Sequence, residues 1–482
     1  MSLSTALSIA QNSLLNTQRQ TGVLSRNIAN AQNADYARRT AVLSTTAPGS
    51  RVAVIQRATD NALFRQNLSA LSGWTAQQAI VEGLDRLSLN VNGVDNASSP
   101  AVLLGKLQNA LQLYSSTPSN RTLAENAVEM SRDVARSLNA SSAEVQAFRT
   151  DMDNQIASGV AELNSLLADF KAVNDDITRG ARSGRETLDS HDARDAILKR
   201  ISELVPISTI SRADNDLMIV TADGATLFET EPRTVSFTPT PAYGPSTQGN
   251  RIFVDGVPLS QANGANTSAG GSLAAMSQLR DVYAVEMQNQ LDEIARGLIE
   301  AFSEPQAAPL TGNRPGLFTW AGAPDMPLPA DTVGLAGRIS LNELVDPTKP
   351  GGQVEKLRDG IGSNVNTDSN ASFSARLIEL VNALDAPRPF TPAGGGSANE
   401  SLMTYTAASI SWVEDARKTA AGAAETKGAL MFRTAEVLSN ITNVNVDEEM
   451  ALMLELEQSY AASAKMLQMI DEMLKTLLSV VR

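Results

Sequence analysis

The sequence predicts a mainly α-helical protein with a β-containing middle and discontinuous domains. Apolar side chains recur at steps of three and four residues near both ends of the 482-residue chain and in several long stretches between them. That spacing gives a helix one narrow apolar face, as in coiled coils. Seventeen of the 20 prolines fall between Pro206 and Pro392. Because proline interrupts helices, the long helices should lie outside that window.

The two terminal segments, 3–31 and 446–481, carry this pattern as two apolar stripes. The N-terminal stripe contains Leu3, Leu7, Leu14, Leu24 and Ile28. The C-terminal stripe contains Val446, Met453, Leu456, Tyr460, Leu467, Ile470, Leu474 and Leu477. A lone helix cannot bury such a stripe, so the termini should pair with each other, with neighbouring subunits, or with both. We therefore expect the protein to assemble through its ends.

The interior alternates between long helices and short strands. Helical periodicity predicts helices at 123–177, 272–303 and 399–441. A turn-like Ala-Asp-Gly sequence within 217–228 predicts a hairpin, and strand signals continue at 234–238 and 251–254. Residues 304–350 are rich in proline and glycine and should be irregular or short-stranded, and Gly394–Ser397 should form a flexible joint.

These patterns predict four regions, two of which combine segments that are distant in sequence. We expect a terminal helical assembly domain (1–60 with 440–482), a long-helix bundle domain (61–205 with 271–303 and 397–439), a strand-rich segment (206–270) and an irregular or mixed outer domain (304–396).

The composition argues against most classes of enzyme and binding protein. The chain has no cysteine and one histidine, which excludes thiolate chemistry and multi-histidine metal sites. A net charge of −14 argues against nucleic acid as a partner, because phosphates require a basic surface. No apolar run is long enough for a membrane span, and the first residues do not resemble a cleaved signal peptide. We expect no enzymatic activity, cofactor or metal.

Two polar clusters were weighed as sites of chemistry. His191 lies between Asp189 and Asp195 and would act as a base if an aspartate oriented it, but no nucleophile motif accompanies it. We interpret this cluster as a helix N-terminus capped by Asp189. Acidic residues at 447–449 lack the spacing of a calcium loop, so we expect Asp447 to cap the last helix.

Short motifs near both ends carry a family resemblance. Asn27, Ile28 and Asn30, followed by Tyr36, resemble the N-terminal signature of bacterial flagellar rod, hook and hook-associated axial proteins. Residues 444–450 and 458–465 resemble their C-terminal signature. Interior sequences at 187–205 and 270–281 are similar to the hook-associated protein 1 family within that group. The family usually has glycine where this chain has Asp35, and aspartate tolerates the left-handed backbone, so we expect the turn to persist.

The resemblance implies a structural protein at the junction of the flagellar hook and filament. Its terminal helices would pair with each other and self-assemble into a helical array, with the long helices as a bundle layer and a smaller strand-rich part outermost. It also implies contacts with the hook protein and with a second junction protein next to the filament. The methionines of the last helix suit packing, and their flexibility also suits an export chaperone. Type III export without a cleaved signal would place the protein outside the cell.

Two other functions remain open at this point. Another flagellar axial protein, of hook or rod type, would share the terminal signatures. A secreted coiled-coil effector or adhesin would share the long helices and the acidic charge, but has no reason to carry both signatures.

Overall fold

The computed structural model describes residues 3–45, 50–259, 270–306, 311–391 and 398–480. The chain forms two compact units, and both are discontinuous in sequence. Unit 1 comprises Met1–Ser72, Leu163–Thr234 and Gly428–Arg482, and unit 2 comprises Gly73–Glu162 and Val235–Lys427. Three long helices supply residues to both units: α2 (Asn61–Asn90), α4 (Arg121–Ser183) and α10 (Leu402–Thr442). The predicted mainly α-helical fold class with small sheets is confirmed.

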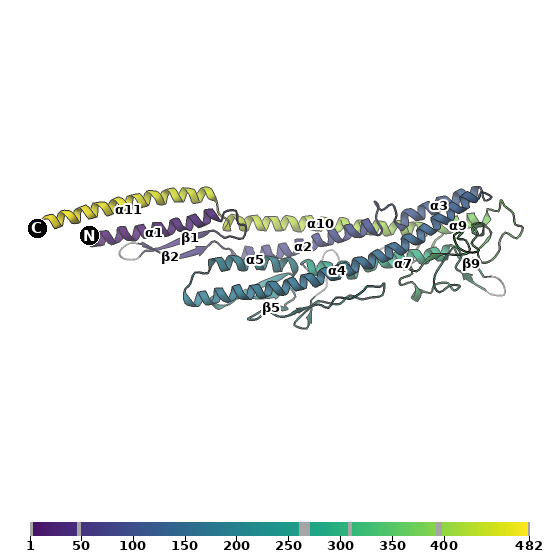
Figure 1. Ribbon diagram of the computed structural model, residues 1–482, viewed down its shortest axis with the longest axis horizontal. Coiled ribbons are helices and arrows are strands. Elements are labelled where there is room, and N and C mark those ends of the chain that lie inside the picture. The colour runs from purple at the N-terminus through teal and green to yellow at the C-terminus, as the bar shows by residue number, and fades with distance from the viewer. Residues whose placement is uncertain (1–2, 46–49, 260–269, 307–310, 392–397, 481–482) are drawn as a thin grey trace. The chain divides into compact units, whose positions relative to one another are not determined.

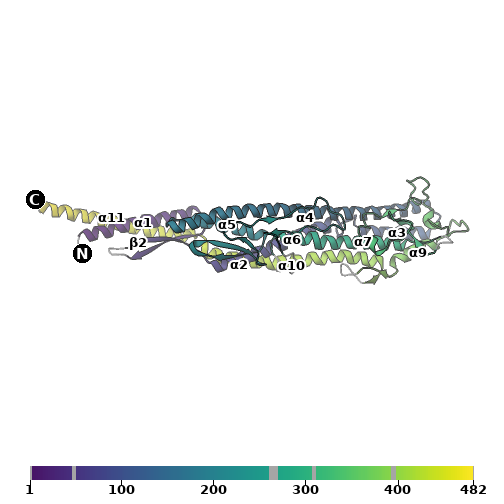
Figure 2. The same cartoon turned by 90° about the horizontal axis from the view of Figure 1, so that it is seen from below.

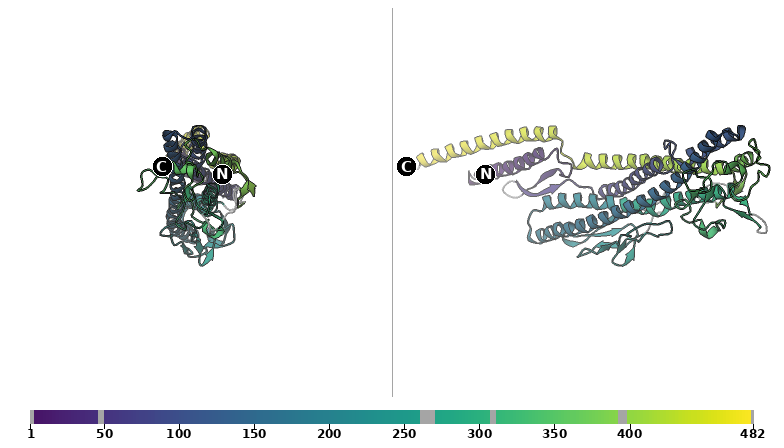
Figure 3. Two further views of the ribbon diagram at one scale, coloured as in Figure 1. Left: turned by 90° about the vertical axis from the view of Figure 1, so that its right-hand side faces the viewer. Right: turned by 45° about the vertical axis from the view of Figure 1, so that its right-hand side comes forward.

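Unit 1 contains the two terminal helices, α1 (Leu3–Ala29) and α11 (Val446–Val480). They lie side by side, as Figures 1 and 2 show from two directions. An antiparallel hairpin of β1 (Arg39–Thr45) and β2 (Ser50–Arg57) packs against α1. Figure 3 shows the same helix pair, in purple and yellow, from a third side. The two apolar stripes predicted from sequence therefore belong to neighbouring helices of one chain.

The rest of unit 1 combines the C-terminal part of α4 with α5 (Leu188–Leu204) and a three-stranded antiparallel sheet. In the sheet, β4 (Leu217–Thr221) lies between β3 (Ile207–Ser211) and β5 (Thr226–Phe228), and a short 3₁₀ helix, η1 (Ala213–Asn215), links β3 to β4. The rings of Phe170 in α4 and Phe228 in β5 meet edge to face with centroids 4.9 Å apart. This contact fixes the sheet against the helix.

Unit 2 is centred on a segment with almost no exposed side chain. Helix α6 (Ser272–Gln278), a single π-helical turn η2 (Leu279–Tyr283) and α7 (Ala284–Ala301) follow one another without a break. Leu291, Ile294 and Leu298 of α7 are at most 1% exposed. Helix α3 (Pro100–Ser116) begins where Ser99 accepts a hydrogen bond from the Val102 amide, and it packs against α9 (Ala375–Asp385).

The remaining elements of unit 2 are short. They are β6 (Val235–Ser236), β7 (Phe253–Val254), β8 (Val257–Pro258), β9 (Glu304–Pro305), β10 (Asn313–Arg314), β11 (Phe318–Thr319), η3 (Pro329–Asp331), β12 (Ser340–Leu341), α8 (Lys356–Asp359), β13 (Arg388–Pro389) and β14 (Asn399–Glu400). Asp255 and Gly256 join β7 to β8 with φ angles of 51° and 82°, the left-handed region that tight hairpins require.

Most predicted elements are present, with adjusted ends. Helix α4 extends the predicted 123–177 helix at both ends and continues through Gly159. The hairpin at 217–228 is confirmed, and residues 304–350 contain short strands, turns and the three-residue helix η3 where they are described. The β1–β2 hairpin, inside the region expected to be helical, was missed, and helices α2, α3 and α9 were not individually predicted. The predicted joint at Gly394–Ser397 lies outside the described residues.

Candidate assembly surface at the paired termini

The two terminal helices run antiparallel, with a defined register. The hydroxyls of Ser13 and Ser463 lie 2.8 Å apart, and Asn27 Nδ2 donates to Glu449 Oε2 at 2.8 Å. The two contacts are equally far apart in sequence on both helices, and residue numbers rise along α1 where they fall along α11. The register leaves the last residues of α11 beyond the beginning of α1, as Figure 1 shows.

A buried side-chain network joins the two helices where α1 ends and α11 begins. Asn27 is fully buried and donates through Nδ2 to the Arg39 carbonyl at 2.9 Å as well as to Glu449. Its Oδ1 accepts from the Tyr36 hydroxyl at 2.8 Å and from the Arg39 amide at 3.1 Å. Burial raises the pKa of Tyr36, which keeps the hydroxyl a donor. Asn27 thus fixes the segment that follows α1 through its hydrogen bonds to Tyr36 and Arg39.

The buried carboxylate of Glu449 is compensated by Arg38. Arg38 Nε donates to Glu449 Oε1 at 2.6 Å, and the Arg38 amide donates to the Thr442 carbonyl at 2.7 Å. Glu449 therefore accepts from the amide of Asn27 and the guanidinium of Arg38, which come from either side of the turn after α1. A buried carboxylate is stable only with such partners. We call Asn27, Tyr36, Arg38 and Glu449 the terminal lock.

A second ion-pair network ties the β1–β2 hairpin to α5. Arg39 bonds Asp189 and Asp192, and Arg57 bonds Asp192 and Asp195. Burial alone would lower the pKa of Arg39, but its bonds to Asp189 and Asp192 hold that pKa above its usual value. The guanidinium therefore stays charged, and α5 is fixed to the segment that follows α1.

The structure places the predicted interface residues at three levels of exposure. Leu24, Asn27, Tyr36 and Ile470 are buried. Leu3, Leu7, Leu14, Ile28, Asn30, Met453, Leu456 and Leu467 are partly exposed. Val446, Tyr460, Leu474 and Leu477 are exposed. Within this set, the structure brings Asn27 and Tyr36 into direct hydrogen-bond contact.

Sequence reasoning missed the polar members of the interface. Glu449 and Ser463 are buried, and they fall on the same stripe as Met453, Leu456 and Leu467 at steps of three and four. A glutamate at an otherwise apolar stripe position was the signal that could have identified it. The prediction that Asp447 caps α11 was wrong: the Asn445 side chain accepts from the amides of Asp447 and Glu448.

The expected turn at Asp35 is present, since the Tyr36 amide donates to the Asn33 carbonyl at 3.1 Å, but the roles expected of Asp35 and Asp189 differ in the structure. Asp35 does not adopt the left-handed backbone; it pairs with Lys199 of α5 at 3.0 Å. Asp189 lies in the first turn of α5, where Thr187 is the N-cap residue, and Asp189 bonds Arg39.

A second apolar stripe on α11 is uncovered in the single chain. Met466, Met469 and Met473 follow one another at helical steps and lead to Leu477, where this stripe meets the predicted one, and between 43% and 55% of each side chain is exposed. Because one stripe faces α1, this neighbouring stripe requires another partner if it is to be buried.

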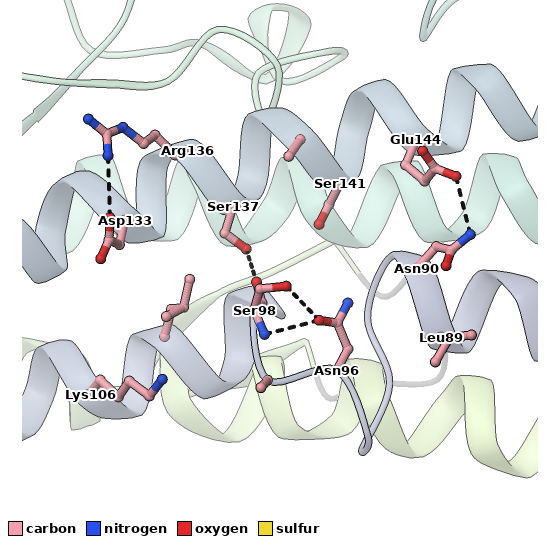
Figure 4. Close-up of a pocket in the computed structure, with 13 residues that line it drawn as sticks. Leu89, Asn90, Asn96, Ser98, Lys106, Asp133, Arg136, Ser137, Ser141 and Glu144 are labelled. Carbon is pink, nitrogen blue, oxygen red and sulfur yellow. Dashed lines mark hydrogen bonds and ion pairs between the residues drawn. The ribbon is translucent and has the colours of Figure 1, made fainter.

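The structure gives no arrangement for catalysis at the sites considered. His191 is paired through Nδ1 with Arg194 at 3.2 Å, and burial, with Arg194 and Arg57, lowers its pKa to about 4. An open cavity of about 850 Å³ in unit 2 is lined by α2, α3 and α4, and several of its polar side chains bond within the wall, as Asn90 does with Glu144 and Ser137 with the Ser98 carbonyl (Figure 4). Among the described residues, no cluster of three or more potential metal ligands occurs, and no helix is both long and apolar enough to cross a bilayer.

Comparisons with known proteins bear on both units. Residues 92–317 match the model of the flagellar hook-associated protein FlgK helical domain, and residues 439–480 match that of the flagellar basal body rod FlgEFG protein C-terminal region. The chain is 21% identical over 419 residues to flagellar hook-associated protein 1 of Bacillus subtilis, covering 82% of this chain and 78% of that protein. The solved flagellar hook junction protein FlgK from Burkholderia pseudomallei aligns with 16% identity and a TM-score of 0.42, over 53% of this chain and 47% of that one.

Proposed function

We propose that this chain, which belongs to the FlgK family of flagellar hook-associated proteins, forms the junction between the flagellar hook and the filament. It does so as a structural axial protein that self-assembles helically through α1 and α11. The match over 92–317 supports a hook-associated protein. The match to the rod protein family covers only the C-terminal residues 439–480, so it does not favour a rod or hook protein.

The observation that carries the proposal is the unpartnered stripe beside the α1–α11 pair. The terminal lock makes one rigid element from the two chain ends, and this element presents Met466, Met469, Met473 and Leu477 outward. Full burial of an exposed methionine or leucine contributes about 1.5–3 kcal/mol, and each of these side chains, already about half covered, gains about half of that. In a helical array each subunit makes the same head-to-tail contact, so the gain is repeated along the structure.

The proposal includes specific partners and a route. The hook protein lies on one side of the array and a second junction protein on the filament side. Before assembly, an export chaperone covers the methionine-rich face of α11, which the adaptable thioether side chains support. The protein leaves the cell by type III export and acts in the extracellular flagellum.

Substitution of Met469 tests the assembly surface. Met469 is 51% exposed, so Met469→Asp should leave the monomer folded by circular dichroism, yet stop filament growth on hooks and release flagellin into the medium. Gln468→Asp adds the same charge at the adjacent exposed position, outside the stripe, and should leave filaments intact. Normal filaments with Met469→Asp, or equal loss with both variants, would contradict the proposal.

A further inference from the structure

A cationic cavity in unit 1 plays no part in the proposed assembly. It has a volume of about 390 Å³ and lies between the end of β2, the beginning of α2, helix α5 and the β3–β4 connection. Four arginines line it, Arg57, Arg65, Arg194 and Arg212, whereas Asp195 is the single lining carboxylate. His191, the only histidine of the chain, also lines it and is neutral at physiological pH because its pKa is lowered to about 4. The wall is therefore positive although the chain carries a net charge of −14.

Two of these arginines already have carboxylate partners. Arg57 bonds Asp192 at 2.6 Å and also bonds Asp195, so the lining carboxylate is taken. Arg212 pairs with Asp216 at 2.8 Å, although its buried Nε has no hydrogen-bond acceptor. The ion pairs within the chain thus do not neutralise the whole cavity wall.

Arg194 is the least compensated group. Its side chain is 6% exposed, and its Nη atoms bond neutral acceptors: Asn174, the Asn215 carbonyl and His191. Its Nε is buried without any acceptor, and no carboxylate of the described residues lies within ion-pair distance. Burial lowers the pKa of Arg194 to about 10. A buried guanidinium without a counter-ion is costly, so a negative group in the cavity would stabilise it.

Arg65 adds a second uncompensated charge at the rim. It is exposed, its Nε donates to the Asn61 carbonyl at 3.2 Å, and it pairs with no carboxylate of the described residues. Guanidinium groups bind oxyanions with paired, charge-assisted hydrogen bonds.

We propose that the cavity lined by Arg65, Arg194, Arg212 and His191 binds a single oxyanion group, a phosphate or a carboxylate. The group comes either from a free ion or from an acidic side chain of a second copy of the chain. It occupies the space in front of Arg194 and is reached by Arg65 from the rim.

The single histidine provides a direct readout. Full-length protein labelled with ¹³C-histidine gives one imidazole signal, that of His191, which is titrated with sodium phosphate against sodium chloride at matched ionic strength. Binding of a free ion should shift the signal saturably with phosphate and not with chloride, and should raise the pKa of His191. A shift that instead follows protein concentration without added phosphate supports the acidic side chain of a second copy.

Three variants make the result decisive. Arg65→Gln removes an exposed side chain, so the fold should persist while phosphate affinity falls by about tenfold or more, as expected for one lost charge-assisted hydrogen bond. Arg194→Gln, checked for folding by circular dichroism, should abolish the saturable shift. Arg433→Gln removes an equally exposed arginine of unit 1 outside the cavity and should bind as the unaltered protein does. No shift with either phosphate or concentration, or the same phosphate response in Arg65→Gln, would overturn the proposal and leave Arg194 as a structural cross-link.

Discussion

Asn27→Asp replaces the amide nitrogen at the centre of the terminal lock by an oxygen, and it should break the contact between α1 and α11. In Asn27→Asp, the side chain keeps its shape and still accepts from Tyr36, but it loses both donors of the amide. The carboxylate of Glu449 then faces a second carboxylate at the position where Asn27 Nδ2 lies 2.8 Å away. Both groups are fully buried, so solvent screens the repulsion poorly.

The size of the loss in local stability follows from the hydrogen bonds that are lost. Two donors disappear, one to Glu449 and one to the Arg39 carbonyl, and each break costs about 1–3 kcal/mol, or more where a charge is left. Arg38 still binds Glu449 and limits the damage. We expect a local loss of about 3–5 kcal/mol, the range found when one partner of a buried charged contact is removed. Since about 1.4 kcal/mol corresponds to tenfold, amide protection should fall by about two to three and a half orders of magnitude.

Hydrogen exchange measured by mass spectrometry is the assay. Peptides from α1 and from the first half of α11 should lose protection at pH 7.5, whereas peptides from α7 in unit 2 should be unaffected. Asn30→Asp is the control, because Asn30 bonds only the Arg26 carbonyl at an exposed site. Equal exchange in the two variants would refute the role assigned to Asn27.

Three further outcomes follow from the packing and the charges. Leu467→Asp should block assembly in the cell, scored by electron microscopy of hooks and filaments. The circular dichroism spectrum of the purified variant should show that unit 2 stays folded. Phe170→Ala should lower the free energy of unfolding in urea by about 3–5 kcal/mol, because Phe170 is fully buried against Phe228; Phe432→Ala, at a side chain 64% exposed, should cost little. His191 takes up a proton at pH 6.5 when unfolded but at about 4 when folded, so stability should fall as the pH drops between those values, by about 1–2 kcal/mol after allowance for partial exposure.

Each of these outcomes has a clear contrary result. Filaments of normal length in Leu467→Asp cells would argue against the α1–α11 stripe. If Phe170→Ala lowered the free energy of unfolding as little as Phe432→Ala is expected to, Phe170 would contribute no packing energy. The slope of stability against pH should flatten in His191→Gln, and an unchanged slope would assign it to other groups.

The sequence was informative where one element carries its own signal. The stripes of α1 and α11 and the periodicity of α4 are visible because apolar side chains recur along a single helix. The β1–β2 hairpin was overlooked although Val42 and Leu43 and the Val52–Ile55 run have strand character, because the preceding helical pattern dominated the interpretation of 1–60.

The sequence predicts the apolar faces of the candidate site but not the contact that joins them. Its central contact joins Asn27 to Glu449, and periodicity reveals which face of a helix is apolar without revealing its partner or register. Glu449 looked like an ordinary acidic residue of a first helical turn, because its burial depends on Arg38 and Asn27 reaching it from the other end of the chain.

The joining of residue 27 to residue 449 also imposes an order on folding. While the polypeptide is being made, helix α1 can pack against the β1–β2 hairpin, but its face that packs against α11 stays exposed to water until the ribosome has passed α11. Unit 2, residues 73–162 and 235–427, is synthesised completely before α11 and can form its own core earlier. A chain that still lacks its final segment therefore leaves Asn27 without its Glu449 partner, and the contact between the two terminal helices is the last one to form.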